Sequence, residues 1–161
     1  LRDELVSLVG AEYKEQASEI KSRAFLLEEL LATQFSSHNA VTERFTQLLK
    51  QDPVRVAIHT HCHQKSWVGN TSIEIVFSLL PGVTFSVLKT GCCGMAGQLG
   101  YENPKFSEKV AKTSFLPALI TLDKETVLIA GGCSCRAQAA ILADIKALHP
   151  AVFLAERLFR E

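Results

Sequence analysis

The residues best suited to chemistry in this 161-residue chain are its five cysteines, which occur in three short segments. Cys62 stands alone, Cys92 and Cys93 are adjacent, and Cys133 and Cys135 are separated by one residue. Thiolates are soft ligands that select iron–sulfur clusters, zinc or copper(I) over metals that prefer oxygen. Because several bare thiolates in one pocket repel one another, their clustering favours a bound cation. The cysteines therefore indicate metal or redox chemistry, provided that the three segments meet.

Each cysteine segment follows a short apolar run that predicts a buried β-strand, and helical patterns separate the runs. The strands are expected over 54–58, 83–88 and 126–130. This alternation predicts βαβ units with right-handed crossovers, hence an α/β fold in three layers with a parallel sheet between helices. Sites in such sheets form beyond the carboxyl ends of the strands. We therefore expect the cysteine loops to converge there.

The remaining chain is predicted to be mainly helical. A long packing helix is expected over 1–34, and Pro117 should end or kink a helix over 106–119. Thr71 and Glu74 have the spacing of a capping box at the start of a helix over 71–80. Further helices are expected over 41–50, 137–148 and 152–159. The chain opens on Leu1 in a charged helical pattern, which suggests a fragment of something longer.

Composition narrows the class of protein. Seventeen basic and seventeen acidic residues cancel without forming blocks, so nothing indicates binding to nucleic acid or an anionic membrane surface. No apolar stretch approaches the roughly 20 residues that span a bilayer, and the N-terminus lacks a signal-peptide pattern. An odd number of cysteines in glycine-rich loops argues against a secreted disulfide framework. We therefore expect a soluble, cytoplasmic protein of one domain or slightly more.

The cysteine pairs predict particular geometries. Adjacent residues of an extended chain point apart, so Cys92 and Cys93 suit two irons of one cluster better than two corners of a tetrahedral zinc site. Residues two apart point to the same side, which would place Cys133 beside Cys135. An inert, buried, small apolar residue is an equal alternative for Cys133.

Histidines beside Cys62 offer nitrogen ligands. On an extended chain His59, His61 and His63 lie opposite Cys62, so either the histidines or the cysteine needs a bend to face the site. Ligation by His61 or His63 in place of one cysteine would give a four-coordinate zinc site. Hydrogen bonding to loop backbone or to a sulfur is the alternative role.

Two cations follow cysteines closely in the sequence. Lys65 and Arg136 can lower the pKa of a thiolate or offset the charge of a cluster. Solvated positions at helix starts are an equal alternative. Without a metal, the adjacent cysteines or the C-x-C pair can carry thiol–disulfide chemistry instead.

Three motifs taken together resemble the cysteine-rich CCG domain. They are His61–Lys65, the stretch Gly91–Gly97 followed by Gly100–Glu102, and Ser134–Arg136 with Gln138. That domain occurs in heterodisulfide reductase subunits and in the iron–sulfur parts of glycolate, lactate and glycerol-3-phosphate dehydrogenases. The chain is most similar to the C-terminal end of fused proteins that join a flavin-linked oxidase domain, a ferredoxin-like segment and two CCG repeats. The resemblance covers roughly residues 54 to 150.

The resemblance implies an electron-transfer module of an FAD-linked 2-hydroxy-acid dehydrogenase of the glycolate or D-lactate type. It implies Cys62, Cys92, Cys93 and Cys135 as ligands of an iron–sulfur cluster, either of the 4Fe-4S type or non-cubane. FAD would lie in another part of the polypeptide or in a partner subunit, beside another CCG repeat. The electron acceptor would be a quinone or a similar carrier, reached in the cytoplasm or at the inner face of the membrane.

The resemblance also divides the chain and leaves the ligand set open. Residues 1–50 would be a helical lead-in, the tail of a preceding repeat, and residues 51–161 the CCG domain, inactive alone. In relatives, five cysteines ending in C-x-x-C bind the cluster, whereas this chain ends in C-x-C, with Cys133 where the fused oxidases carry threonine. A four-ligand cluster, a zinc site and a metal-free thiol pocket all follow from this pattern.

Overall fold

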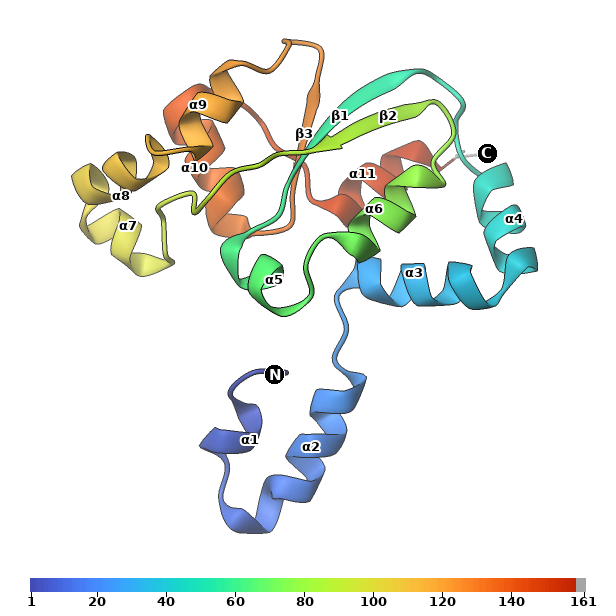
Figure 1. Ribbon diagram of the computed structural model, residues 1–161, viewed down its shortest axis with the longest axis vertical. Helices are drawn as coiled ribbons and strands as arrows, with labels where there is room; N and C mark the ends of the chain where they lie inside the picture. The colour runs from blue at the N-terminus through green and yellow to red at the C-terminus, as the bar shows by residue number, and fades with distance from the viewer. Residues whose placement is uncertain (159–161) are drawn as a thin grey trace.

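The computed structural model describes residues 1–158 and has an α/β fold built on three parallel strands (Figure 1). The central strand is β1 (Val54–His59), with β2 (Val83–Val87) on one side and β3 (Val127–Ala130) on the other. Val56 of the central strand pairs with residues of both neighbours, and both ladders are parallel. The predicted strands and the parallel sheet are confirmed.

Helices make up most of the rest of the described chain. The N-terminal part contains α1 (Leu5–Leu8), the 3-10 turn η1 (Ala11–Tyr13), α2 (Lys14–Arg23), α3 (Leu27–Ser37) and α4 (Asn39–Gln47). Between β1 and β3 lie α5 (Cys62–Trp67), α6 (Thr71–Ser78), α7 (Gln98–Glu102), α8 (Pro104–Ala111) and α9 (Phe115–Ile120). After β3 come α10 (Cys133–Ala143) and α11 (Pro150–Arg157).

Alternate residues of β1 face two separate apolar layers, because successive side chains of a strand point to opposite sides. Val56 and Ile58 pack with residues of α3, α6 and α11, whereas Ala57 packs with residues of α8, α9 and α10. Phe77 of α6 stacks on Phe153 of α11 at 5.6 Å between ring centroids. The sheet therefore lies between two helical layers, which confirms the predicted three-layer fold.

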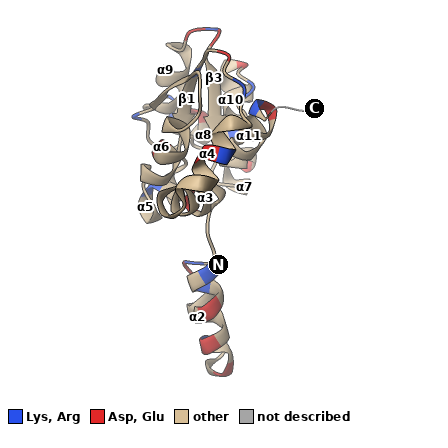
Figure 2. Ribbon diagram, turned by 90° about the vertical axis from the view of Figure 1, so that its right-hand side faces the viewer, with Lys and Arg blue, Asp and Glu red and all other residues tan. Residues whose placement is uncertain are grey.

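The N-terminal helices are not the single helix expected over 1–34. Helices α1 and α2 project away from the body of the molecule, whereas α3 packs along α6 (Figures 1 and 2). The break precedes α3, where Leu26 has an extended backbone and its N–H donates to Glu29 Oε2 at 2.9 Å. A second break occurs at Gly10, which is also extended. Local capping therefore overrides the continuous apolar pattern.

The helix expected over 106–119 is divided between α8 and α9. The break lies before Phe115, and Pro117 falls in the first turn of α9, where a missing N–H costs no helical hydrogen bond. Asn70, rather than Thr71, is the N-cap of α6, and its side chain makes no capping bond. The expected kink at Pro117 and the predicted capping box are therefore both wrong.

The third helix lies further towards the N-terminus than expected. Helix α10 begins at Cys133, before the predicted Ala137, and ends at Asp144, which adopts a left-handed conformation with φ 54°. Leu148 then forms a bridge to Ile129 of β3 instead of continuing the helix. The last helix corresponds to α11, and residue 159 of the predicted range lies outside the described residues. Within residues 1–158 the helices are all too short or too polar to cross a bilayer.

Candidate metal centre

The three cysteine segments lie at the same edge of the sheet, beyond the carboxyl ends of the strands. Helix α5 begins at Cys62 just after β1, the loop after β2 carries Cys92 and Cys93, and α10 starts shortly after β3 and contains Cys135. The structure thus brings together four cysteines from distant parts of the sequence, as strand order predicted. Their type and number suit a soft metal or an iron–sulfur cluster.

The four sulfurs form a connected group. The Cys93 and Cys135 side chains are hydrogen-bonded, Cys62 and Cys92 are hydrogen-bonded, and Cys92 also reaches Cys93. Donation from Cys135 lowers the pKa of the Cys93 thiol to about 6, and the same contact, together with burial, raises the pKa of Cys135. The group therefore holds its charge on Cys93 first, as expected where thiols share a proton.

The thiols are arranged as hydrogen-bonded sulfhydryls rather than as metal ligands around one point. Within residues 1–158 no group of three or more Cys, His, Asp or Glu side chains has its ligand atoms placed to hold a metal ion. The donor set itself fits a thiophilic metal or a cluster, because four sulfurs adjoin and two of the cysteines, Cys93 and Cys135, are buried. Binding would deprotonate the thiols and replace their mutual hydrogen bonds with bonds to metal.

Cys133 lies apart from the other four cysteines. It is exposed at the first position of α10, whereas Cys135 in the next half-turn is buried. Residues two apart in a helix differ by about 200° in direction, so the expectation that an extended chain would place Cys133 beside Cys135 is wrong. Ligation by Cys133 stays a prediction for which the structure provides no contact.

Gly94 fixes the shape of the loop that carries the cysteine pair. Its φ is 90°, and a Cβ at this position would collide with the carbonyl oxygen of Ser107 in α8. The Gly94 N–H donates to Cys92 Sγ at 3.3 Å, which opposes the effect of burial, the main cause that raises the pKa of Cys92. Ser114 Oγ accepts the N–H of Gly91 at 2.8 Å. The loop is therefore seated closely against α8 and α9.

The two cations singled out by the sequence have different positions. Lys65 Nζ donates to the Thr90 carbonyl oxygen at 2.5 Å, and its ammonium lies within electrostatic reach of Cys135 and Cys62. Burial lowers the pKa of Lys65, and the two thiols oppose this shift. Arg136 instead donates to the carbonyl oxygens at the end of β3, at 2.8 and 2.9 Å. Lys65 can therefore offset sulfur charge, whereas Arg136 braces the turn.

His59 is buried beside the cysteine group, although its sequence context assigned it no role beyond that of its neighbours. It is 1% exposed, its Nδ1 lies 2.7 Å from Thr90 Oγ1, and its ring packs on Phe115. Within residues 1–158, Nε2 has no hydrogen-bond partner. Burial, followed by the charges of Lys65 and His61, lowers the pKa of His59 to about 4. The period-two alternation of β1 was the available signal, since it places His59 on the same face as Ala57.

This buried histidine predicts an acid-sensitive fold. Below pH 6.5 the unfolded chain binds a proton at His59 that the folded chain does not accept until about pH 4, so stability falls as the pH decreases across this window. At about 1.4 kcal/mol per pKa unit the full effect is roughly 3 kcal/mol. We expect the free energy of unfolding of the metal-free chain, measured with urea from pH 7 to 4, to fall less in His59→Gln. Equal losses in both proteins would contradict this assignment.

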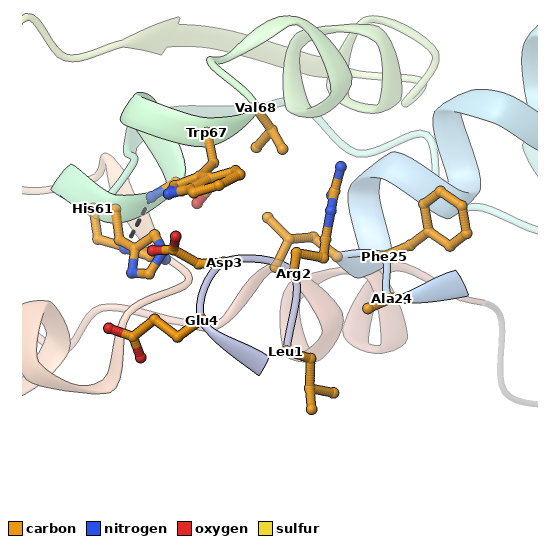
Figure 3. A pocket seen from close by; sticks show the side chains of 12 residues that line it. Leu1, Arg2, Asp3, Glu4, Ala24, Phe25, His61, Trp67 and Val68 are labelled. Carbon is orange, nitrogen blue, oxygen red and sulfur yellow. Dashed lines mark hydrogen bonds and ion pairs between the residues drawn. The ribbon is translucent and has the colours of Figure 1, made fainter. Parts of the chain in front are cut away.

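His61 and His63 line a groove beside the cysteine group. His61 caps α5, its Nδ1 accepting from the Gln64 N–H at 3.3 Å, and His63 Nε2 lies 3.7 Å from Asp3 Oδ2. With Trp67 they border a largely apolar groove of about 350 Å³ between α5 and the N-terminal segment (Figure 3). Burial, then the neighbouring His63, lowers the pKa of His61.

The helix that begins at Cys62 overturns the expectation of an extended chain with the histidines on one side. His61 remains close to the cysteine group, because a Cβ at Gly132 would meet both His61 Cβ, at 3.2 Å, and Cys135 Sγ, at 3.1 Å. The structure places His63 in contact with the groove and with Asp3, not with a cysteine. Ligation by either histidine stays a prediction, better supported by position for His61.

Comparison with known proteins finds relatives among dehydrogenases. The chain is 28% identical over 112 residues to the C-type chain of anaerobic glycerol-3-phosphate dehydrogenase from Escherichia coli (strain K12), a match that covers 68% of this chain and 28% of that relative. It is 34% identical over 101 residues to D-2-hydroxyglutarate dehydrogenase from Pseudomonas putida and over 102 residues to that from Haemophilus influenzae. Each of these matches covers 61% of this chain and 10% of the enzyme.

The chain therefore spans less than a third of the length of the curated relatives it matches. No family model matches the chain, and no solved structure matches it. The comparisons place the chain as homologous to a segment of larger dehydrogenases. This is the coarser part of the family resemblance that the cysteine motifs indicated.

Proposed function

We propose that this chain is the electron-transfer module of an FAD-linked 2-hydroxy-acid dehydrogenase of the glycolate or D-lactate type, and that it binds an iron–sulfur cluster. The observation that carries the proposal is the contact of four thiols from three strand ends, Cys62, Cys92, Cys93 and Cys135. The homologous dehydrogenases supply the redox setting. A cluster of the 4Fe-4S type or a non-cubane cluster suits four sulfur ligands.

When bound, the cluster supplies reversible one-electron transfer, and the residues around it control its surroundings. The four cysteines hold it, with Cys93 and Cys135 on the buried side, at 5% and 4% exposure. The Lys65 ammonium and the N-terminal end of α10 place positive charge near the sulfurs. Burial and hydrogen bonding to sulfur are two protein properties that set a cluster's potential.

The same proposal places FAD and substrate outside this chain. FAD would be bound by another domain or a partner subunit, together with another CCG repeat, and residues 51–161 would form the CCG domain after a lead-in over residues 1–50. Part of that lead-in belongs structurally with the domain, because Ala32 and Phe35 of α3 lie in its core. We therefore expect no dehydrogenase activity from this chain alone, and association with a flavin-containing partner in the cytoplasm or at the inner face of the membrane.

The direct test is spectroscopic. The full chain, produced and reconstituted without oxygen, should show visible charge-transfer absorption that bleaches on reduction with dithionite and yields a paramagnetic signal. Cys92→Ser should lose most of this absorption, whereas a serine at the exposed Cys133 should keep it. A colourless wild-type chain after reconstitution would reject an iron–sulfur role.

The groove beside α5 supports a place for the electron acceptor, which we propose to be a quinone. It adjoins the helix that starts with Cys62 and combines apolar walls with the imidazoles of His61 and His63. Trp67, the chain's single tryptophan, is 47% exposed in the groove and reports binding directly. We expect a short-chain ubiquinone analogue to quench its fluorescence saturably, and at about tenfold higher concentration in His63→Ala, for the loss of roughly one hydrogen bond. Linear, non-saturating quenching in both proteins would exclude the groove as the quinone site.

A metal-free thiol–disulfide function is the second candidate, favoured by one contact. Cys93 and Cys135 come from different elements, and their thiols are hydrogen-bonded, so a disulfide between them is closer at hand than the C-x-C pair suggested by sequence. Alkylation and mass mapping of the chain under mild oxidant distinguish the candidates. A Cys93–Cys135 disulfide that forms and reduces reversibly in metal-depleted and metal-supplemented chain alike would favour this function. Zinc in the same sulfur set is the third outcome that metal analysis would reveal.

A further inference from the structure

One buried polar atom near the cysteine group lacks a partner. His59 Nε2 belongs to a side chain that is 1% exposed, and within residues 1–158 it makes no hydrogen bond. Leaving a buried donor or acceptor unsatisfied costs about 1–3 kcal/mol. Such a cost calls for a reason beyond packing, since an apolar ring of similar size would fill the same space.

The position of His59 points to the cysteine site. His59 ends β1, and its ring packs on Phe115, a member of the apolar cluster that also contains Cys93 and Cys135. Its partner Thr90 lies two residues before Cys92 and accepts a hydrogen bond from the Lys65 ammonium through its carbonyl oxygen. The same ammonium acts on His59, Cys62 and Cys135. The imidazole and the sulfurs therefore share one neighbourhood behind the strand ends.

Thr90 also determines which ring nitrogen carries the proton. Within the described residues the Thr90 hydroxyl has His59 Nδ1 as its only hydrogen-bond partner, at 2.7 Å. A hydroxyl that donates to Nδ1 leaves the proton of a neutral imidazole on Nε2. The unpartnered atom is then an N–H donor, which matches the anionic sulfurs of a metal–thiolate or iron–sulfur group and would be useless towards a cation.

We propose that His59 Nε2–H donates a hydrogen bond to a sulfur of the metal–sulfur group held by the cysteines, and that this bond stabilises the reduced, more negative state of that group. His59 is thus a positioning residue rather than a ligand. The inference rests on the proposed function for its redox consequence. Its structural half requires only that a thiophilic metal occupies the site.

The redox half is tested by the midpoint potential of the reconstituted full chain. In His59→Phe, which keeps a ring but has no donor, we expect the equilibrium constant for one-electron reduction to fall about tenfold, which is a midpoint about 59 mV more negative. His59→Gln, which returns an N–H donor, should recover most of the shift. Thr90→Val, which releases the ring, should shift the potential in the same direction and serves if His59→Phe does not fold. Wild-type potentials in His59→Phe and Thr90→Val would overturn the inference.

The structural half has a readout that does not depend on iron. In ¹⁵N-histidine NMR of the full chain, His59 should be the Nε2–H tautomer, and its N–H should become protected from solvent exchange on loading with zinc. An unprotonated Nε2, or unchanged exchange after loading, would refute the hydrogen bond. A wild-type chain that binds zinc with this change but never assembles a cluster would instead reject the proposed function and leave the hydrogen bond in place.

Discussion

Replacement of Cys93 by serine is expected to abolish metal incorporation, with the iron content of the anaerobically reconstituted chain falling at least about tenfold. Cys93 is buried, accepts a hydrogen bond from Cys135 and is the thiol whose pKa lies lowest, at about 6. It is therefore the first sulfur ready to bind at neutral pH, since metal binding requires the thiolate. A serine hydroxyl at this position stays protonated and offers a hard oxygen in place of a soft sulfur.

Cys133→Ser is the matched control for this experiment. Both substitutions exchange sulfur for oxygen, but Cys133 is exposed at the start of α10, away from the hydrogen-bonded thiols. Iron and acid-labile sulfide in Cys133→Ser should stay at the wild-type level. An equal loss in both variants would mean that the C-x-C pair acts as a unit and that α10 rearranges on binding.

Gly94→Ala is expected to disrupt the same site through the backbone. The alanine must adopt a φ of 90° and displace the Ser107 carbonyl of α8. Left-handed strain costs about 1–2 kcal/mol and overpacking about 1–3 kcal/mol, so together we expect a loss of roughly 3 kcal/mol in the free energy of unfolding. Because Gly94 also donates its N–H to Cys92, the displaced loop should incorporate metal poorly. Urea unfolding and metal content of the same preparations measure both effects.

Gly97→Ala separates strain from collision. Gly97 lies in the same loop with a φ of 63°, but a Cβ there meets nothing within 4 Å. This variant should lose only about 1 kcal/mol and keep its metal content. If Gly97→Ala proves as damaging as Gly94→Ala, close seating of the loop against α8 is not what positions the cysteine pair.

The strands and the edge at which the cysteines meet were predictable from sequence because they depend on repeating patterns. Three apolar runs separated by helical periods admit few arrangements other than a parallel sheet, and strand ends in such a sheet share one edge. Helix ends were less predictable, since they depend on single interactions. Glu29 restarts the chain as α3 at Leu26, and the left-handed Asp144 ends α10 before Leu148, which pairs with β3 instead.

Within the site, ligand types were predictable and ligand directions were not. The pattern identified Cys62, Cys92, Cys93 and Cys135, but treating 59–63 and 133–135 as extended predicted wrong directions for their side chains, since α5 and α10 begin inside these segments. His59 illustrates the remaining gap. Its burial depends on Thr90 and Phe115, which are distant in sequence, so no local pattern distinguishes it from the exposed His63.

Elemental analysis of the anaerobically produced full chain tests the central claim, that four strand-end thiols hold one iron–sulfur cluster. The account predicts iron and acid-labile sulfide in comparable amounts, with both lost together when any of Cys62, Cys92, Cys93 or Cys135 is replaced. About one zinc per chain without sulfide, or iron retained after replacement of these cysteines, would contradict it.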